Sequence, residues 1–167
     1  TVRNVAKAAG YTTGALVHYY PSKSDLFLAA SEHAAHIVRP RMEREEVEFP
    51  GLEGVRQVIY EALPRNPQQR ALWSVWLVFW DRARIDPEIG KLARERYTEW
   101  QGRLARLFKR AQEAGDVSGA FAPATLARTA TVLVDGIAIQ ALRTGMRLSG
   151  PQQTEMIDAW LESLRRR

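Results

Sequence analysis

The chain of 167 residues contains no cysteine and only three histidines. Without cysteine it can form no disulfide, thiolate zinc site or cysteine nucleophile, which fits a reducing compartment, and we expect a cytoplasmic protein. The longest apolar run, Val75 to Trp80, is far too short to cross a bilayer, so we expect no membrane partner. The chain starts within a structural motif and shows no signal peptide.

Signatures of enzymes and metal sites are also scarce. The sequence has no phosphate-binding loop, nucleotide fingerprint or nucleophile elbow, and we expect no enzyme. His33 and His36 have the i, i+3 spacing of some metal sites, with Glu32 nearby, but no further ligand cluster accompanies them. We therefore interpret them as surface histidines and expect neither a metal nor a cofactor.

The hydrophobic spacing predicts an all-α fold. Strand-like alternation is absent, and most glycines and prolines separate the periodic segments. A long helix from Ser22 to about Glu46 contains Pro40, where it should kink or end. The later expected helices span residues 52–63, 68–84, 88–114, 123–142 and a last segment after Pro151. The net charge of +5 favours a polyanionic partner only weakly, because basic residues alternate with acidic ones.

The first residues, TVRNVAKAAGYTTGALVHYYPSKSDL, have the pattern of a helix, a tight turn and a second short helix. Thr1 can cap the first helix, and Gly10 can end it in the left-handed conformation. The second helix follows at residues 14–20, and Ser22 with Asp25 forms a capping box for a third. Two short helices joined in this way form the motif that lays its second helix in the DNA major groove.

This segment resembles the DNA-binding domain of TetR-type bacterial repressors, whose pattern runs T-[VTI]-R-x-[IVL]-A-x-x-[AL]-G-V-[ST]-x-x-[TAS]-[LVI]-Y-x-[YH]-[FVY]-x-[SN]-K-x-x-L. The runs LWSVWLVFWDRARIDPEIGKLARERYTEWQGRLARLF and LVDGIAIQALRTG resemble the C-terminal domain of BetI-like repressors. The resemblance implies a DNA-binding domain at 1–45, including the connecting helix, and an effector-binding and dimerisation domain at 46–167. The family packs one more helix before the motif. We expect its residues to precede Thr1 in the complete protein and the inner faces of Val5, Ala9 and Leu16 to be partly uncovered here.

The exposed face of the second helix carries the residues expected to reach DNA. Base-edge contacts specify a sequence, whereas phosphate contacts position the protein. Ala15 and Val17 offer only apolar contacts, so we expect few direct base hydrogen bonds. Tyr20 could instead pack beneath the motif, and His18 could be an ordinary surface histidine. Positions in the motif and the resemblance also add residues on the helices before and after the second helix. The candidate set is Arg3, Thr12, Thr13, Gly14, Ala15, Val17, His18, Tyr19, Tyr20 and Lys23.

An aromatic helix predicts a pocket for an effector. From Leu72 to Trp80 only Ser74 is not apolar, so this helix should run through the centre of its domain. Pockets between bundle helices are aromatic with a few polar groups, although such a stripe is also typical of ordinary core. The BetI resemblance suggests a quaternary ammonium ligand, which an aromatic cage would bind through its ring faces. The candidate pocket residues are Tyr60, Trp76, Phe79, Trp80, Tyr97, Trp100 and Asp135.

Asp135 interrupts an apolar helix, and its carboxylate needs a partner. The candidates are an arginine such as Arg82 or Arg128, the end of a neighbouring helix, or a ligand. Gly136 beside it indicates a close approach of another helix.

These features predict a repressor that binds a palindromic operator in double-stranded DNA as a homodimer and is released by a small-molecule effector. By the resemblance, the last two helices, about 123–147 and 151–166, form the two-fold interface. Effector binding would shift the population toward a dimer whose recognition helices no longer fit DNA, with the connecting helix as lever. The alternative is a helical interaction or ligand-sensing module without DNA binding. An enzyme has less support still.

Overall fold

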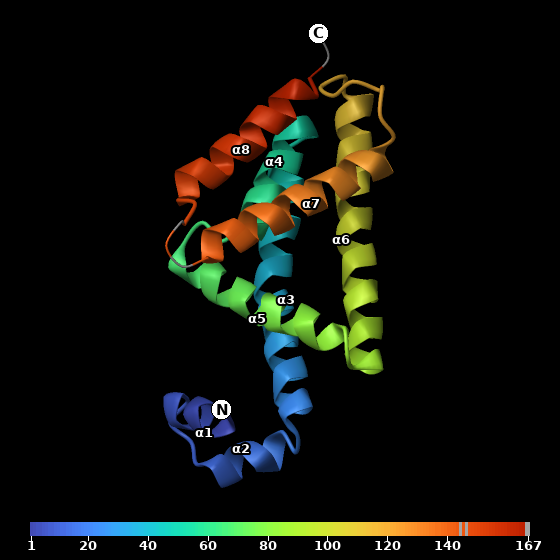
Figure 1. Cartoon of the computed structure of the whole chain (residues 1–167). Coiled ribbons are helices and arrows are strands. Elements are labelled where there is room, and N and C mark those ends of the chain that lie inside the picture. Colours follow the sequence, from blue (N-terminus) through green and yellow to red (C-terminus); the bar gives the residue numbers. More distant parts are fainter. Residues whose placement is uncertain (144, 146, 166–167) are drawn as a thin grey trace.

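The computed structural model describes residues 1–143, 145 and 147–165, which form eight α-helices and no β-strand. The predicted all-α fold is confirmed. The helices are α1 (Val2–Ala8), α2 (Thr13–Tyr19), α3 (Lys23–Glu48), α4 (Gly51–Ala62), α5 (Pro67–Ala83), α6 (Pro87–Glu113), α7 (Pro123–Leu142) and α8 (Gly150–Ser163). Figure 1 shows α1 and α2 together at one end, joined to the bundle of α4 to α8 by the long helix α3.

The helix-turn-helix forms as its local signals predict. The Thr1 hydroxyl accepts a hydrogen bond from the Asn4 amide at 3.2 Å, and Gly10 follows α1 with φ of 74°. Leu16 is buried between the two short helices, whereas Val5 is 44% exposed. The expected uncovered inner face is therefore found at Val5 and also at Ala9, but not at Leu16.

Helix α3 begins at a complete capping box, in which the Ser22 hydroxyl and the Asp25 carboxylate each accept from the other residue's backbone amide. It continues through Pro40 to Glu48, so the helix does not end at the proline. Proline removes the amide that would bond the His36 carbonyl, and both residues are exposed, so water can solvate that carbonyl. The division expected between residues 45 and 46 falls inside this continuous helix.

The main core lies where α4, α6, α7 and α8 meet. Its fully buried side chains include Val55, Val58, Ile59, Leu104, Phe108, Ala130, Ile157 and Leu161. By length and composition α7 could span a membrane, but its inner side, with Ala130, Val134 and Ile137, is buried in this core. It is therefore a helix of the core.

A smaller cluster lies at the end of the bundle nearer to α1 and α2. Phe79, Ile89 and Ala93 are buried there, and Phe27 and Leu28 of α3 pack against them. The Phe27 and Phe79 rings stack with centroids 6.3 Å apart. The first turns of α3, which follow α2, are thus in direct contact with the aromatic helix α5.

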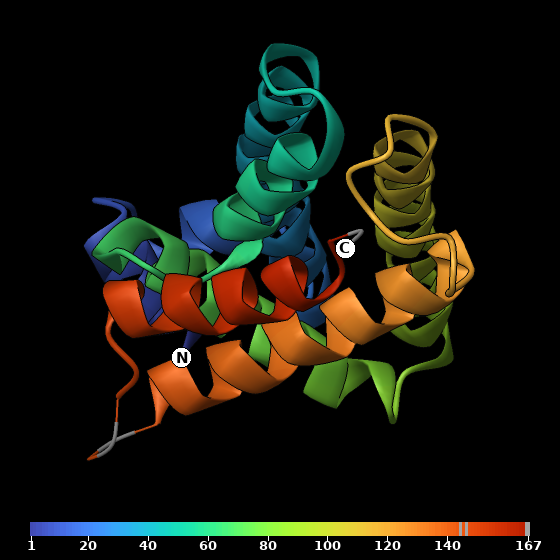
Figure 2. The same cartoon turned by 90° about the horizontal axis from the view of Figure 1, so that it is seen from above.

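Helices α7 and α8 lie on one outer face of the bundle, and Figures 1 and 2 agree in showing them side by side. Val132, Ile139 and Met156 are exposed large apolar side chains on these helices. A Cβ at Gly136 would meet no heavy atom within 4 Å. The close helix approach expected at Gly136 is therefore not made within the described part of the chain.

Candidate functional site

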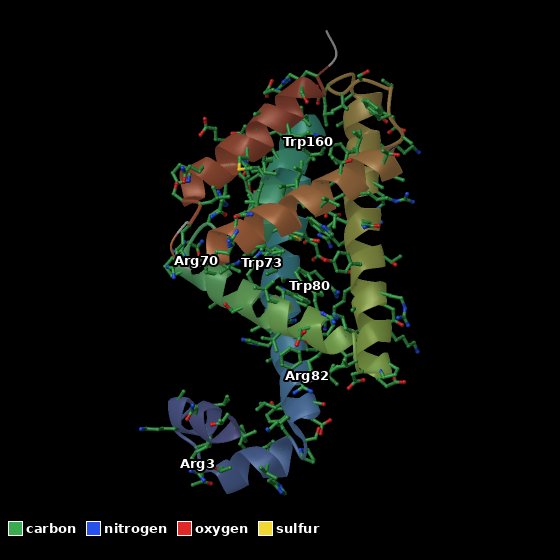
Figure 3. The ribbon with its side chains drawn as sticks, in the orientation of Figure 1. Arg3, Arg70, Trp73, Trp80, Arg82 and Trp160 are labelled. Carbon is green, nitrogen blue, oxygen red and sulfur yellow. The ribbon has the colours of Figure 1, made fainter. Side chains whose placement is uncertain are left out.

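Most residues predicted to contact DNA lie exposed at the α1–α2 end of the molecule. They are Arg3, Thr12, Thr13, Gly14, Val17, His18, Tyr19 and Lys23, whereas Ala15 and Tyr20 are half-buried. Figure 3 shows Arg3 on this end, far from the aromatic side chains of the bundle. The half-burial of Tyr20 is what packing beneath the motif requires.

The N-terminal half of α2 is an exposed and capped helix start. Thr12 caps it, because its hydroxyl oxygen accepts from the Ala15 amide at 3.1 Å. The hydroxyl proton of Thr12 stays available for a phosphate or base oxygen. Lys23 is the first residue of α3, where free backbone amides favour anions. The polar groups available to DNA are therefore concentrated at the starts of α2 and α3.

The bundle contains an open cavity of about 190 Å³ lined by residues of α3, α4, α5, α6 and α7. Figure 3 shows Trp73 and Trp80 on the side of α5 that faces α7, and both side chains line the cavity. The Trp73 and Trp80 ring centroids are 5.4 Å apart, and those of Trp80 and Tyr97 are 5.7 Å apart. Six of the seven predicted pocket residues line this one cavity: Trp76, Phe79, Trp80, Tyr97, Trp100 and Asp135.

Tyr60, the seventh, lies outside the cavity. Its hydroxyl donates to Asp158 of α8 at 2.5 Å, and Arg56 contacts the same carboxylate. The guanidinium of Arg65 lies 4.8 Å from the centre of the Tyr60 ring. Tyr60 therefore belongs to a polar contact between α4 and α8, on the other side of its helix from the aromatic cavity.

Asp135 is bound by a neutral group, not by an arginine. The Tyr97 hydroxyl donates to the Asp135 carboxylate at 2.8 Å, and in the part of the chain that the structure describes neither Arg82 nor Arg128, the two arginines among the candidates, forms an ion pair with it. Arg82 is exposed near the end of α5, and Figure 3 shows it on the side away from α7. Burial raises the pKa of Asp135 from 3.8 to about 6, although the bond from Tyr97 acts in the opposite direction. The pKa of the Tyr97 hydroxyl is raised by burial and by the neighbouring carboxylate.

The cavity also contains charged residues that the sequence analysis did not select. Arg39, Glu61, Arg96, Glu99 and Arg103 line it, as does the indole of Trp73. Arg96 and Arg103 are seven residues apart on α6, on the same face as Tyr97 and Trp100. Helical spacing could therefore have grouped Arg96 and Arg103 with the predicted pocket. They were not selected because arginine side chains usually lie in solvent.

Charge pairing leaves one carboxylate of the cavity without a cation. Arg39 pairs with Glu99 at 3.0 Å, Arg96 with Glu32 at 3.3 Å, and Arg103 with Glu46 at 2.7 Å. Glu61 lies between Arg41 and Arg65, at 4.0 and 3.8 Å. Among the residues that the structure describes, Asp135 alone of the lining acids has only a neutral partner. Aromatic faces beside such a carboxylate can stabilise a small organic cation.

Two known families match the chain. Residues 1–30 match the family of bacterial regulatory proteins named after tetR, and residues 51–166, more than half of the chain, match the C-terminal domain of BetI-type transcriptional repressors. The regulator PksA of Bacillus subtilis, of the helix-turn-helix type, is 32% identical over 85 residues, which are 50% of this chain and 42% of that protein. The match therefore covers less than half the length of this relative.

Solved structures share the fold at low sequence identity. A transcriptional regulator from Saccharomonospora viridis in complex with choline has a TM-score of 0.90 at 23% identity, covering 100% of this chain and 88% of the other. A regulator from a Rhodococcus species has a TM-score of 0.83 at 21% identity, covering 98% and 84%. These likenesses extend over both the helix-turn-helix and the bundle.

Proposed function

Because the chain belongs to the TetR family of transcriptional regulators and carries a BetI-type C-terminal domain, we propose that it is a cytoplasmic repressor released by a small organic cation. It binds a palindromic operator as a homodimer, with α2 of each protomer in the major groove. The observation that carries the effector class is the aromatic cavity in which Asp135 lacks a cationic partner. The choline complex of the regulator from S. viridis supports the same class.

The proposed DNA contact rests on the exposed start of α2 and on the two basic residues beside it. Thr13, Gly14 and Val17 face the base edges, Lys23 holds a phosphate, and Arg3 contacts either a phosphate or a guanine edge. Val17 and Ala15 present methyl groups, which suit the thymine methyl, so much of the affinity comes from phosphate contacts and depends on salt.

The homodimer is proposed to form through α7 and α8, over the ranges 123–147 and 151–166. Residues 144, 146 and 166 of these ranges lie outside the residues that the structure describes. Exposed apolar side chains on both helices, and the open space at Gly136, support an interface on this face. Glycine here lets a partner helix approach closely.

Choline titrated into the protein should change the tryptophan fluorescence saturably, because Trp73, Trp76, Trp80 and Trp100 line the cavity. Choline should also lower the affinity for a duplex selected from a randomised DNA library by about tenfold or more at fixed salt. The uncharged analogue with a tert-butyl group in place of trimethylammonium is the matched control and should bind far more weakly. No saturable fluorescence change with choline would refute this effector.

Removing Lys23 tests the phosphate contacts. Lys23→Ala should weaken binding to the selected duplex and to unrelated duplexes alike, and should reduce the slope of log affinity against log salt by about 1. Arg3→Ala should do the same if Arg3 contacts a phosphate, and should relax sequence preference if it reads a guanine. Lys91→Ala, which changes an exposed residue of α6, serves as the control. An unchanged salt slope in Lys23→Ala would contradict this contact.

A further inference from the structure

Arg96 connects the cavity to the helix that leads to the DNA-binding end. Its guanidinium lies 5.1 Å from the centre of the Trp76 ring and 5.2 Å from that of Phe79. It also donates to the backbone carbonyl of Ser31 at 3.0 Å and to Glu32 at 3.3 Å. One side chain of α6 thus occupies the aromatic lining and holds α3 two turns after its first residue.

The contact lies in the first part of α3, which follows α2. Ser31 is fully buried, and Phe27 one turn earlier stacks on Phe79, the ring that also lies beneath Arg96. Other ion pairs between α3 and α6 involve Arg39, Arg103 and Arg110 and lie farther along α3. Arg96 is therefore the bridge nearest to α1 and α2.

The surroundings of Arg96 stabilise its positive charge only in part. Only 15% of its side chain is exposed, whereas 68% of the Glu32 side chain is, so solvent weakens that ion pair. Burial lowers the pKa of Arg96, which reflects the cost of keeping this charge away from water. A second cation in the cavity would repel the guanidinium and would compete for the face of Trp76.

We propose that Arg96 is an internal competitor of the effector. In the free protein its guanidinium rests on Trp76 and Phe79 and holds α3 at Ser31, and a bound organic cation displaces it and releases this end of α3. The inference rests on the proposed function for the charge of the effector. The two states differ in what Arg96 contacts, which is the differential interaction that a population shift requires. Release changes the tilt of α3, and with it the position of α2.

The variant Arg96→Gln separates competition from a merely structural role. We expect it to bind choline about tenfold more tightly, because the competing charge is gone, whereas loss of a structural contact would weaken binding. In the free variant, amide hydrogen exchange over residues 28–35 should rise to the level of choline-bound wild type, and choline should raise it no further. Its affinity for the selected duplex should already be low without choline.

Two further variants complete the experiment. Arg39→Gln removes another bridge between α3 and α6 and another cavity arginine, but one that is half-exposed and does not lie on Trp76 or Phe79, so exchange over residues 28–35 should stay near wild type. Glu32→Gln, outside the cavity, should raise that exchange by a smaller amount than Arg96→Gln. Cooperative thermal unfolding of each variant checks that it is folded.

The outcomes distinguish this inference from the proposed function. If neither wild type nor Arg96→Gln binds choline, the proposed effector is refuted, and with it the competition. If both bind choline with equal affinity and show equal exchange over residues 28–35, Arg96 is no competitor, and the proposed effector stands. Tighter binding by Arg96→Gln together with faster exchange in its free form supports the inference.

Discussion

Asp135→Asn should weaken choline binding about 100-fold at neutral pH, equivalent to about 3 kcal/mol, because it removes the carboxylate that would pair with the cation inside the cavity. In the wild type the Tyr97 hydroxyl donates a 2.8 Å hydrogen bond to the Asp135 carboxylate. The asparagine side-chain oxygen can still accept this hydrogen bond. The change therefore removes charge while the local packing is kept. Isothermal calorimetry measures the effect directly.

The same substitution should stabilise the ligand-free protein. The pKa of Asp135 in the folded state is about 6, above its ordinary value of 3.8, so the folded state binds this proton more tightly than the unfolded chain does. The resulting stabilisation is present at low pH and is lost as the pH rises through about 6. Above that pH the ionised carboxylate costs at most about 3 kcal/mol, less whatever solvent screening recovers.

Urea unfolding of ligand-free wild type and Asp135→Asn at a series of pH values measures this cost. The variant should be the more stable by about 1–3 kcal/mol at pH 7.5, and the difference should shrink toward pH 4. Choline affinity of wild type should fall below pH 6 as the carboxylate takes up a proton, whereas that of the variant should stay flat. The groups that share the cavity are Arg39, Glu61, Arg96, Glu99 and Arg103, and each has a partner of opposite charge.

Asp81→Asn, an exposed carboxylate on α5, is the control and should change neither quantity. Choline binding by Asp135→Asn at the wild-type affinity would exclude the carboxylate as the ligand's partner. A buried carboxylate that destabilises the ligand-free protein is expected at a site where that carboxylate binds the ligand.

Local signals in the sequence predicted the helices well because each boundary has its own chemistry. Thr1, Ser22 and Asp86 cap helix starts through their side chains, and Gly10 and Gly115 follow helix ends with positive φ. Pro40 shows the limit of this reasoning. A proline inside a helix is destabilising, but the tertiary contacts along α3 and an exposed position for the lost hydrogen bond outweigh its cost.

The cavity was predictable only in part, because helical spacing says which residues share a face but not what the face meets. The aromatic residues of α5 and α6 share faces and line one cavity, as grouped from the sequence. Tyr60 was grouped by residue type alone, and it contacts α8 instead. The partner of Asp135 could not be chosen from the sequence, since Tyr97 lies 38 residues away and only the packing of α6 on α7 brings the two together.

Val132→Arg should give the second large effect, by converting the proposed dimer into monomers. Val132 is 69% exposed on the outer face of α7, one turn before Gly136 and two before Ile139. In a two-fold interface the same surface occurs on both protomers, so the change buries an arginine at two equivalent positions, each against the partner's apolar surface and without a counter-charge. Sedimentation equilibrium at micromolar protein should show the loss of the dimer.

Loss of the dimer should also weaken DNA binding. One helix-turn-helix contacts a single half-site, and the second half-site contributes through its high effective concentration, so the affinity for a palindromic duplex should fall about 100-fold or more. Choline binding should survive, because the residues that line the cavity come from α3 to α7 of one chain. Val47→Arg introduces the same charge at an 89% exposed position on α3 and should leave both assembly and DNA affinity unchanged. If wild type itself sediments as a monomer once any residues that precede Thr1 in the complete protein are included, two-site binding through α7 and α8 is excluded, and each half-site must be bound alone.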